Sequence, residues 1–208
     1  MKTQALRYPR IKSLILITVF VAAVTVGRAA DAPPKPLYPD IKPVCSCEDL
    51  AKVSIPNTTI DSAALDPTNG WCRVDATVTH PPSGDRVKVF ITLPVTNWNG
   101  RFRGNGGGGF LGGHPSALRG PVAQGYAAGA TDTGHEGGSG KFALDENGRL
   151  NWQLIRDNAY LGIHDMTVVG QSAHTSLLRQ TSALLLFRRR LHGWTPGLDG
   201  GAAFPRRL

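Results

Sequence analysis

The sequence contains 208 residues with a mass of 22.2 kDa, of which 41% are hydrophobic and 18% charged, and its formal net charge is +8. This length suits one domain, or one domain and part of another, and the composition excludes a wholly disordered chain. Five of the 23 basic residues lie in residues 1–29 and six lie after Gly170, so residues 30–170 carry 12 basic and 14 acidic residues. Because this central part has no basic excess, we expect no nucleic-acid partner.

Residues 1–29 have the three parts of a secretory signal peptide. Basic residues precede the apolar run Leu14–Val26, and Gly27-Arg28-Ala29 offers small residues where signal peptidase cleaves. A membrane anchor is the alternative, but the run is short for a span of about 20 residues. We therefore expect cleavage after Ala29, a secreted or periplasmic protein, and no stable membrane anchor.

A Pro-rich stretch and a hairpin follow in chain order. Residues 30–44 are rich in proline, which favours an extended surface segment. Residues 74–78 and 87–91 each alternate apolar and polar side chains, and Pro-Pro-Ser-Gly-Asp at 81–85 separates them. That pattern predicts two antiparallel strands joined by a turn.

The next segments indicate the first part of an α/β domain. Arg101-Phe102 is expected to begin a strand, and residues 104–113 form a Gly-rich loop. Residues 125–131 read as a strand of small residues, and the polar stretch 132–135 follows its carboxyl end, where open α/β sheets place their sites. Apolar spacing over residues 158–170 predicts a helix.

The Gly-rich loop has three possible roles. Its backbone N–H groups could approach a phosphate, but no Lys-Ser or Lys-Thr pair follows and no clean G-x-G-x-x-G opens a helix. It could supply one donor of an oxyanion hole, as the early Gly-rich loop does in α/β-hydrolases. It could also be a flexible surface loop, and the loop taken alone favours this reading.

The order of several motifs over residues 45–170 resembles the tannase and feruloyl esterase family of secreted serine esterases, which includes the terephthalate mono-ester hydrolases. The resemblance implies an α/β-hydrolase core, with a lid domain inserted between nucleophile and acid, and hydrolysis of esters of aromatic acids such as gallate and ferulate. A structural calcium in the lid of many members is also implied. The motifs that carry it are Cys47–Leu50, Trp71–Val74, Trp98–Phe102, the Gly-rich loop, Gly125–His135 and His164–Thr167.

The resemblance also assigns roles to single residues. The backbone of Gly107 or Gly108 would supply the early oxyanion donor. Asp132 and His135 match the family's T-D-T-G-H stretch, but the family's acid and base come much later in the chain, so we expect neither to belong to a triad. His164 falls in the predicted helix, where packing or capping is the favoured role over catalysis.

Three cysteines leave one unpaired, or paired outside this sequence. In the light of the resemblance we expect Cys47 to pair with Cys72, which would orphan Cys45. No cofactor is expected for this chain, because the lid that would hold the family's calcium is not in the sequence.

The tail departs from the family. A second strand and a G-C-S-x-G-G nucleophile elbow are expected after the helix, yet no elbow occurs in residues 171–208. When residues 170–208 are back-translated and shifted by one base, the code permits an ungapped family-like continuation that includes G-S-T-G-G. We therefore expect a frameshift near Gly170 and an out-of-frame tail over residues 171–208.

The sequence thus predicts an α/β chain that is the N-terminal portion of an α/β-hydrolase fold with an incomplete sheet. Its expected domains are a signal peptide (1–29), an extended segment (30–44), the esterase part (45–170) and the shifted tail (171–208). It would be a truncated, inactive ester hydrolase that lacks elbow, acid and base. A non-catalytic secreted binding module built on the same fold is the alternative, and a nucleotide-binding protein is a third reading.

Overall fold

A computed structural model describes residues 33–179, 184–188 and 202–204, all within one compact unit, Pro33–Leu208. The predicted signal peptide and most of the predicted out-of-frame tail lie outside the described residues. The sheet consists of β1 (Thr58–Asp66), β2 (Trp71–Val78), β3 (Val87–Pro94), β4 (Arg101–Asn105), β5 (Ala127–Thr131), β6 (Leu184–Arg188) and β7 (Ala202–Phe204).

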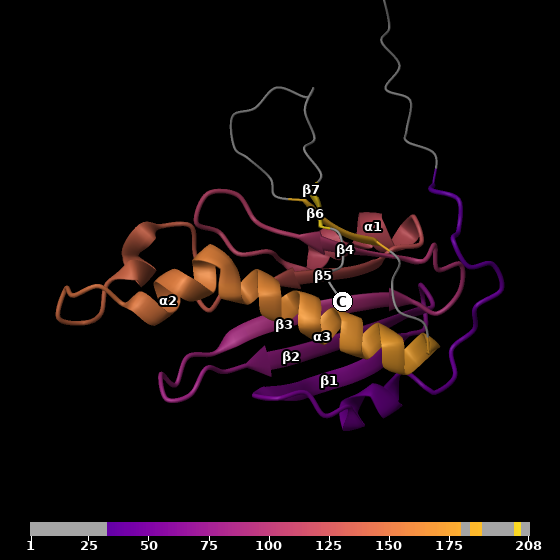
Figure 1. The fold of residues 1–208 in the computed structure, drawn as a ribbon, viewed down its shortest axis with the longest axis horizontal. Helices are drawn as coiled ribbons and strands as arrows, with labels where there is room; N and C mark the ends of the chain where they lie inside the picture. The colour runs from indigo at the N-terminus through magenta and orange to yellow at the C-terminus, as the bar shows by residue number, and fades with distance from the viewer. Residues whose placement is uncertain (1–32, 180–183, 189–201, 205–208) are drawn as a thin grey trace, which may run out of the picture. The chain divides into compact units, whose positions relative to one another are not determined.

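One short helix precedes β1, and the other helices of the described residues lie between β4 and β5 or between β5 and β6 (Figure 1). The long helix is α3 (Gly162–Leu178), and the π-helical turn η4 (Asp157–Leu161) precedes it. No helix among the described residues is long and apolar enough to cross a membrane. The shorter helices are η1 (Glu48–Lys52), η2 (Pro115–Leu118), α1 (Arg119–Ala123), η3 (Gly140–Ala143) and α2 (Trp152–Arg156).

The strands form one mixed sheet in the order β1-β2-β3-β5-β4-β6-β7. Strands β1, β2 and β3 are an antiparallel meander, whereas β4 runs parallel to both of its neighbours, β5 and β6. Parallel neighbours need crossover connections, and the segment with η2 and α1 and the segment with α3 provide them. The α/β class and the predicted hairpin, now β2 and β3, are therefore confirmed.

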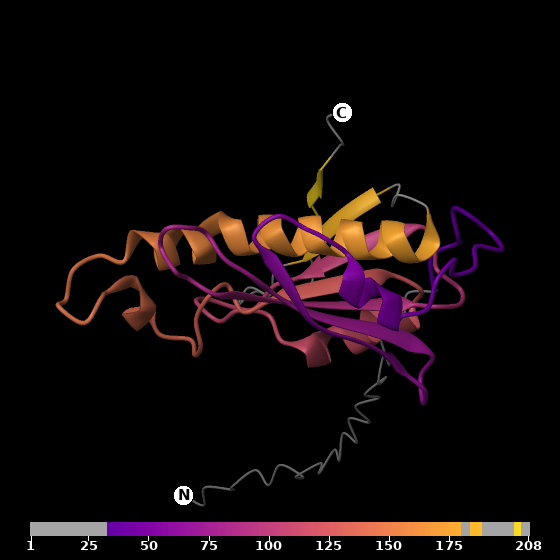
Figure 2. The ribbon, with the colours of Figure 1, turned by 90° about the horizontal axis from the view of Figure 1, so that it is seen from below.

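Helix α3 covers one face of the sheet, as Figure 2 shows from the side. Alternate residues of β3, from Val87 to Leu93, are fully buried against it, as the two-residue period of a strand requires. Met166, Val169, Ala173 and Leu177 form the apolar stripe of the helix. On the other sheet face, Leu118 and Val122 of η2 and α1 pack with Ala128, Ala130, Trp71 and Phe90.

The small residues of β5 let α3 approach the sheet closely. A Cβ on Gly129 would lie 2.8 Å from the ring of Phe102 and 3.0 Å from Met166 of α3. A Cβ on Gly170 of α3 would lie only 2.3 Å from the same ring. The Phe102 ring, which is fully buried, thus occupies space that two glycines leave open.

Two sequence expectations differ from the structure. The edge strand β1 was not predicted, because most of its side chains are exposed and a bulge between Ile60 and Ser62 breaks its period. The helix expected over 158–170 belongs to a longer helical run from Trp152 to Leu178. Asn151 caps its start by accepting a hydrogen bond from Leu154 N, and Arg179, with φ of 50°, ends it.

Candidate functional site

The carboxyl ends of three parallel strands meet at one edge of the sheet. The register pairs Asn105 at the end of β4 with Ala130 of β5 and with Arg188 at the end of β6. The loops that leave β4 and β5 therefore start side by side, which is where α/β sheets assemble their sites. The Gly-rich loop follows β4, and the T-D-T-G-H stretch follows β5.

The Gly-rich loop folds back tightly onto the end of β5. A Cβ on Gly107 would lie 2.1 Å from the carbonyl oxygen of Leu111, and one on Gly112 would lie 2.3 Å from that of Asp132. Gly113 N donates to the carbonyl of Thr131 over 2.6 Å. Only glycine permits this approach of backbone to backbone, so the loop is a packed turn at the sheet edge.

Gly107 and Gly108, the predicted oxyanion donors, lie in the half-buried part of this turn. Within the described residues, neither backbone N–H donates a hydrogen bond to a protein acceptor. A pocket of about 30 Å³ adjoins Gly107, lined by other loop glycines and by Thr131, Thr133 and Asn158. Free N–H groups beside a small pocket suit an oxyanion, and their role as donors stays a prediction.

Asp132 fixes the turn that follows β5. Its Oδ1 accepts hydrogen bonds from the backbone N–H groups of Lys88 and Gly134, each over 2.8 Å. Burial raises the pKa of Asp132, although both hydrogen bonds oppose the shift. The next residue, Thr133, has a φ of 61°, a left-handed conformation that is rare for a β-branched residue. The Asp132 carboxylate thus holds a strained turn in place.

His135 joins the two loops. Its Nε2 lies 2.7 Å from the carbonyl oxygen of Phe110 in the Gly-rich loop, and its ring stacks on Phe142 at a centroid distance of 3.9 Å. His164 lies in α3, as expected for a helical position, but its side chain is 68% exposed and its Nδ1 is 3.2 Å from Asp165 Oδ1. Neither histidine contacts a serine or cysteine nucleophile among the described residues.

The expected disulfide between Cys47 and Cys72 is present, and Cys45 is free. The bridge ties the start of η1 to the buried strand β2. The Sγ of Cys45 lies 3.6 Å from the carbonyl oxygen of Ser176 near the end of α3.

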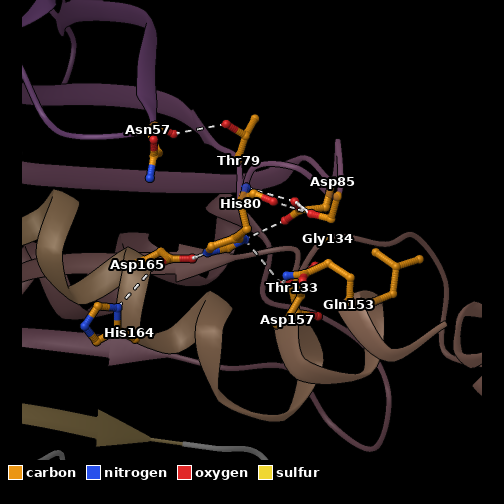
Figure 3. A network of polar contacts seen from close by, with 12 residues as sticks. Asn57, Thr79, His80, Asp85, Thr133, Gly134, Gln153, Asp157, His164 and Asp165 are labelled. Carbon is orange, nitrogen blue, oxygen red and sulfur yellow. Dashed lines mark hydrogen bonds and ion pairs between the residues drawn. The ribbon is translucent and has the colours of Figure 1, made fainter.

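Sequence reasoning missed a polar cluster around His80. Its imidazole lies between the carboxylates of Asp85, Asp157 and Asp165, which come from the β2–β3 turn, η4 and α3 (Figure 3). Burial raises the pKa of Asp157 to about 6, and the nearby charge of Asp85 adds to the rise although Gln153 opposes it. The members lie up to 85 positions apart, so no local spacing could reveal the cluster.

Desolvation alone would lower the pKa of His80, but its hydrogen bond to Asp85 and the charges of all three aspartates raise it. Of the described residues, His80, Asp85 and Asp157 are a group that could hold a metal ion, with ligand atoms within 4.8 Å of one another. Calcium prefers oxygen ligands, so a group with an imidazole does not fit the calcium that the family resemblance implies.

The sequence model of the family described as "Tannase and feruloyl esterase" matches residues 72–193. A protein named "Probable feruloyl esterase", from Arthroderma benhamiae, is 35% identical over 157 residues. That alignment covers 73% of this chain and 28% of the relative, so the chain spans less than a third of the length of this curated relative.

Solved structures of related enzymes share the fold. Feruloyl esterase B from Aspergillus oryzae superposes with a TM-score of 0.57 at 23% identity, covering 69% of this chain and 31% of that one. Tannin acyl hydrolase from Aspergillus niger gives a TM-score of 0.56 at 22% identity, with coverage of 70% and 32%. The described sheet is thus part of an α/β-hydrolase fold, as the sequence predicted. Because the family model matches more than half of the residues, the chain belongs to the tannase and feruloyl esterase family.

Proposed function

We propose that this protein is built to hydrolyse carboxylic esters of aromatic acids, and that the Gly-rich loop supplies the early oxyanion donors. The observation that carries the proposal is the sheet edge where the parallel strands β4 and β5 end, because the loop with Gly107 and Gly108 folds there against the start of the T-D-T-G-H stretch. A nucleophile elbow is a sharp turn after such a strand. A serine there would attack the ester carbonyl within reach of the free loop N–H groups.

The chemistry would be acyl transfer through a covalent intermediate. A histidine takes the proton of the attacking serine and returns it to the leaving alcohol, and an acid orients the histidine. Each backbone N–H aimed at the developing oxyanion lowers the barrier by about 3 kcal/mol. The packed turn suits this role, because His135 and Gly113 fix the loop and no reorganisation is needed during the reaction.

We further propose that the 208-residue chain does not itself turn over esters. Its sequence contains no G-C-S-x-G-G elbow. The change of reading frame near Gly170 remains a prediction. Two observations favour a position later than Gly170. Helix α3 buries Ala173 and Leu177, which follow Gly170, and the family match continues to residue 193.

An oxidising compartment is the proposed place of action. The disulfide between Cys47 and Cys72 supports it, because such bonds persist in secreted and periplasmic proteins and are rare in the cytosol. This agrees with the signal peptide expected over residues 1–29.

Ester turnover by two purified proteins tests the function. One is the 208-residue chain, and the other is the product of the same gene read with the one-base shift after the codon of Gly170. We expect only the second to hydrolyse methyl ferulate and methyl gallate, faster than the aliphatic control ethyl butyrate. Turnover by the first that a serine-directed inhibitor abolishes would overturn the proposal. Binding of aromatic esters without turnover by either protein would favour the binding module instead.

A further inference from the structure

Four side chains from the β2–β3 turn, η4 and α3 converge beside the end of β2. His80 Nδ1 lies 2.6 Å from Asp85 Oδ2 and 3.5 Å from Asp157 Oδ1, and His80 Nε2 lies 3.1 Å from Asp165 Oδ2. Figure 3 shows the imidazole between the three carboxylates. Nδ1 therefore faces two carboxylates, and Nε2 faces the third.

The three carboxylates are buried, and two of their oxygens, Asp157 Oδ2 and Asp165 Oδ2, have no hydrogen-bond partner among the described residues. Asp157 is fully buried, and the side chain of Asp85 is 3% exposed. Asp157 Oδ1 accepts a hydrogen bond from Gln153 Nε2 over 2.8 Å, but Oδ2 has no hydrogen-bond partner among the described residues. A buried carboxylate oxygen without a donor is costly, so this atom indicates a missing ligand.

The local charge also lacks a counterpart. Three carboxylates face His80, only Asp165 also lies beside the exposed His164, and within residues 33–179 no ion pair links any of the three to a lysine or arginine. Even a protonated His80 would offset only one of the three negative charges. A divalent cation that replaces the proton between Nδ1 and Asp85 Oδ2 would offset the remainder, and these two atoms would move apart from their present 2.6 Å to hold it.

We propose that His80 Nδ1, Asp85 and Asp157 bind a divalent transition metal, for which Zn²⁺ is the best fit. One nitrogen and two carboxylate ligands are a set that zinc accepts, with a fourth position left for water. The oxygen-preferring Ca²⁺ and Mg²⁺ are less suited to it. A histidine that binds metal through one ring nitrogen typically donates the other N–H to a carboxylate, and Asp165 stands at that position.

The metal would link two segments of the fold that the disulfide between Cys47 and Cys72 does not connect. It would hold the turn between β2 and β3 against η4 at the start of α3. The π-helical turn of η4 places Asp157 toward the turn, and such turns are frequent at functional sites. The site lies next to Gly134, because a Cβ on that residue would lie 3.3 Å from Asp157 Oδ2. A bound metal would therefore also support the T-D-T-G-H stretch.

Metal titration of the full 208-residue chain tests the proposal. After dialysis against EDTA, we expect one Zn²⁺ to bind per chain by calorimetry and to raise the melting temperature, and excess Ca²⁺ not to compete. Asp165→Asn should weaken binding about 10- to 100-fold, and His80→Gln and Asp157→Asn should weaken it more. The matched controls His114→Gln and Asp40→Asn, at exposed positions outside the cluster, should bind like the wild type.

Absence of stoichiometric Zn²⁺ binding by the wild type would overturn the proposal, and so would equal affinity in all variants. Circular dichroism checks that each variant folds. If the His80 and Asp157 variants do not fold, nitrogen NMR of the wild type decides. Zn²⁺ should then shift the Nδ1 resonance of His80 and leave that of His114 unchanged, and an unchanged His80 resonance contradicts the proposal.

Discussion

At the scale of single residues, Asp132 holds the carboxyl end of β5 against β3. Its Oδ1 accepts from Lys88 N, and its own N–H donates to the carbonyl of Lys88 over 3.1 Å. The matching T-D-T-G-H residues were recognised in the sequence as part of a loop at a strand end. The role of Asp132 in fixing the turn could not be predicted, because it depends on a hydrogen bond from Lys88, which lies 44 positions earlier.

Burial of the ionised Asp132 carboxylate lowers the free energy of unfolding at high pH, and an amide at this position would avoid that loss. Because its pKa is raised in the folded protein, the folded state binds the proton more tightly than the unfolded state. The free energy of unfolding therefore falls as pH rises from the unfolded pKa, about 3.9, through the raised folded value. In Asp132→Asn the amide oxygen can still accept both N–H groups, so we expect a folded protein whose stability falls less steeply over that range.

Urea unfolding of Asp132→Asn at a series of pH values measures this effect. The exposed Asp40→Asn is the control and should keep the wild-type profile. A profile for Asp132→Asn as steep as that of the wild type would contradict the assigned cause.

At the scale of elements, the contact of α3 with the sheet depends on glycine. The sequence predicted β5 as a strand of small residues but could not show why its side chains must be small. The reason is the Phe102 ring, which fills the space above Gly129 and below Gly170. The edge strand β1 and the ends of the helical run escaped prediction, because a bulge and two local caps set them.

Replacement of Gly170 by alanine tests this packing. The new Cβ would collide with the Phe102 ring, so we expect a loss of about 1–3 kcal/mol in the free energy of unfolding. Gly120→Ala in α1 is the matched control, since nothing lies within 4 Å of its Cβ position. That variant should be as stable as the wild type or up to about 1 kcal/mol more stable by helix propensity. Equal denaturant midpoints for the two variants would refute the close approach.

At the scale of the whole molecule, the chain holds the early strands of an esterase fold and spans 28% of the curated relative that it matches. The family, the fold class and the disulfide could be predicted, because each follows from the family resemblance, whose motifs are short and keep their order along the sequence. The cluster around His80 could not, since the fold alone brings its residues together. The place of the Gly-rich loop beside the end of β5 follows from the β4–β5 register, which the sequence does not state.

The central claim is that the sheet edge beside Gly107 is an esterase site whose nucleophile the present reading frame lacks. Intact-protein mass spectrometry after treatment with a fluorophosphonate tests it most directly, because that reagent adds covalently to activated serines. The 208-residue chain should gain no adduct, whereas the product with the one-base shift after Gly170 should gain one adduct on the serine of its G-S-T-G-G sequence. An adduct on the 208-residue chain, or none on the shifted product when it is folded, would contradict the account.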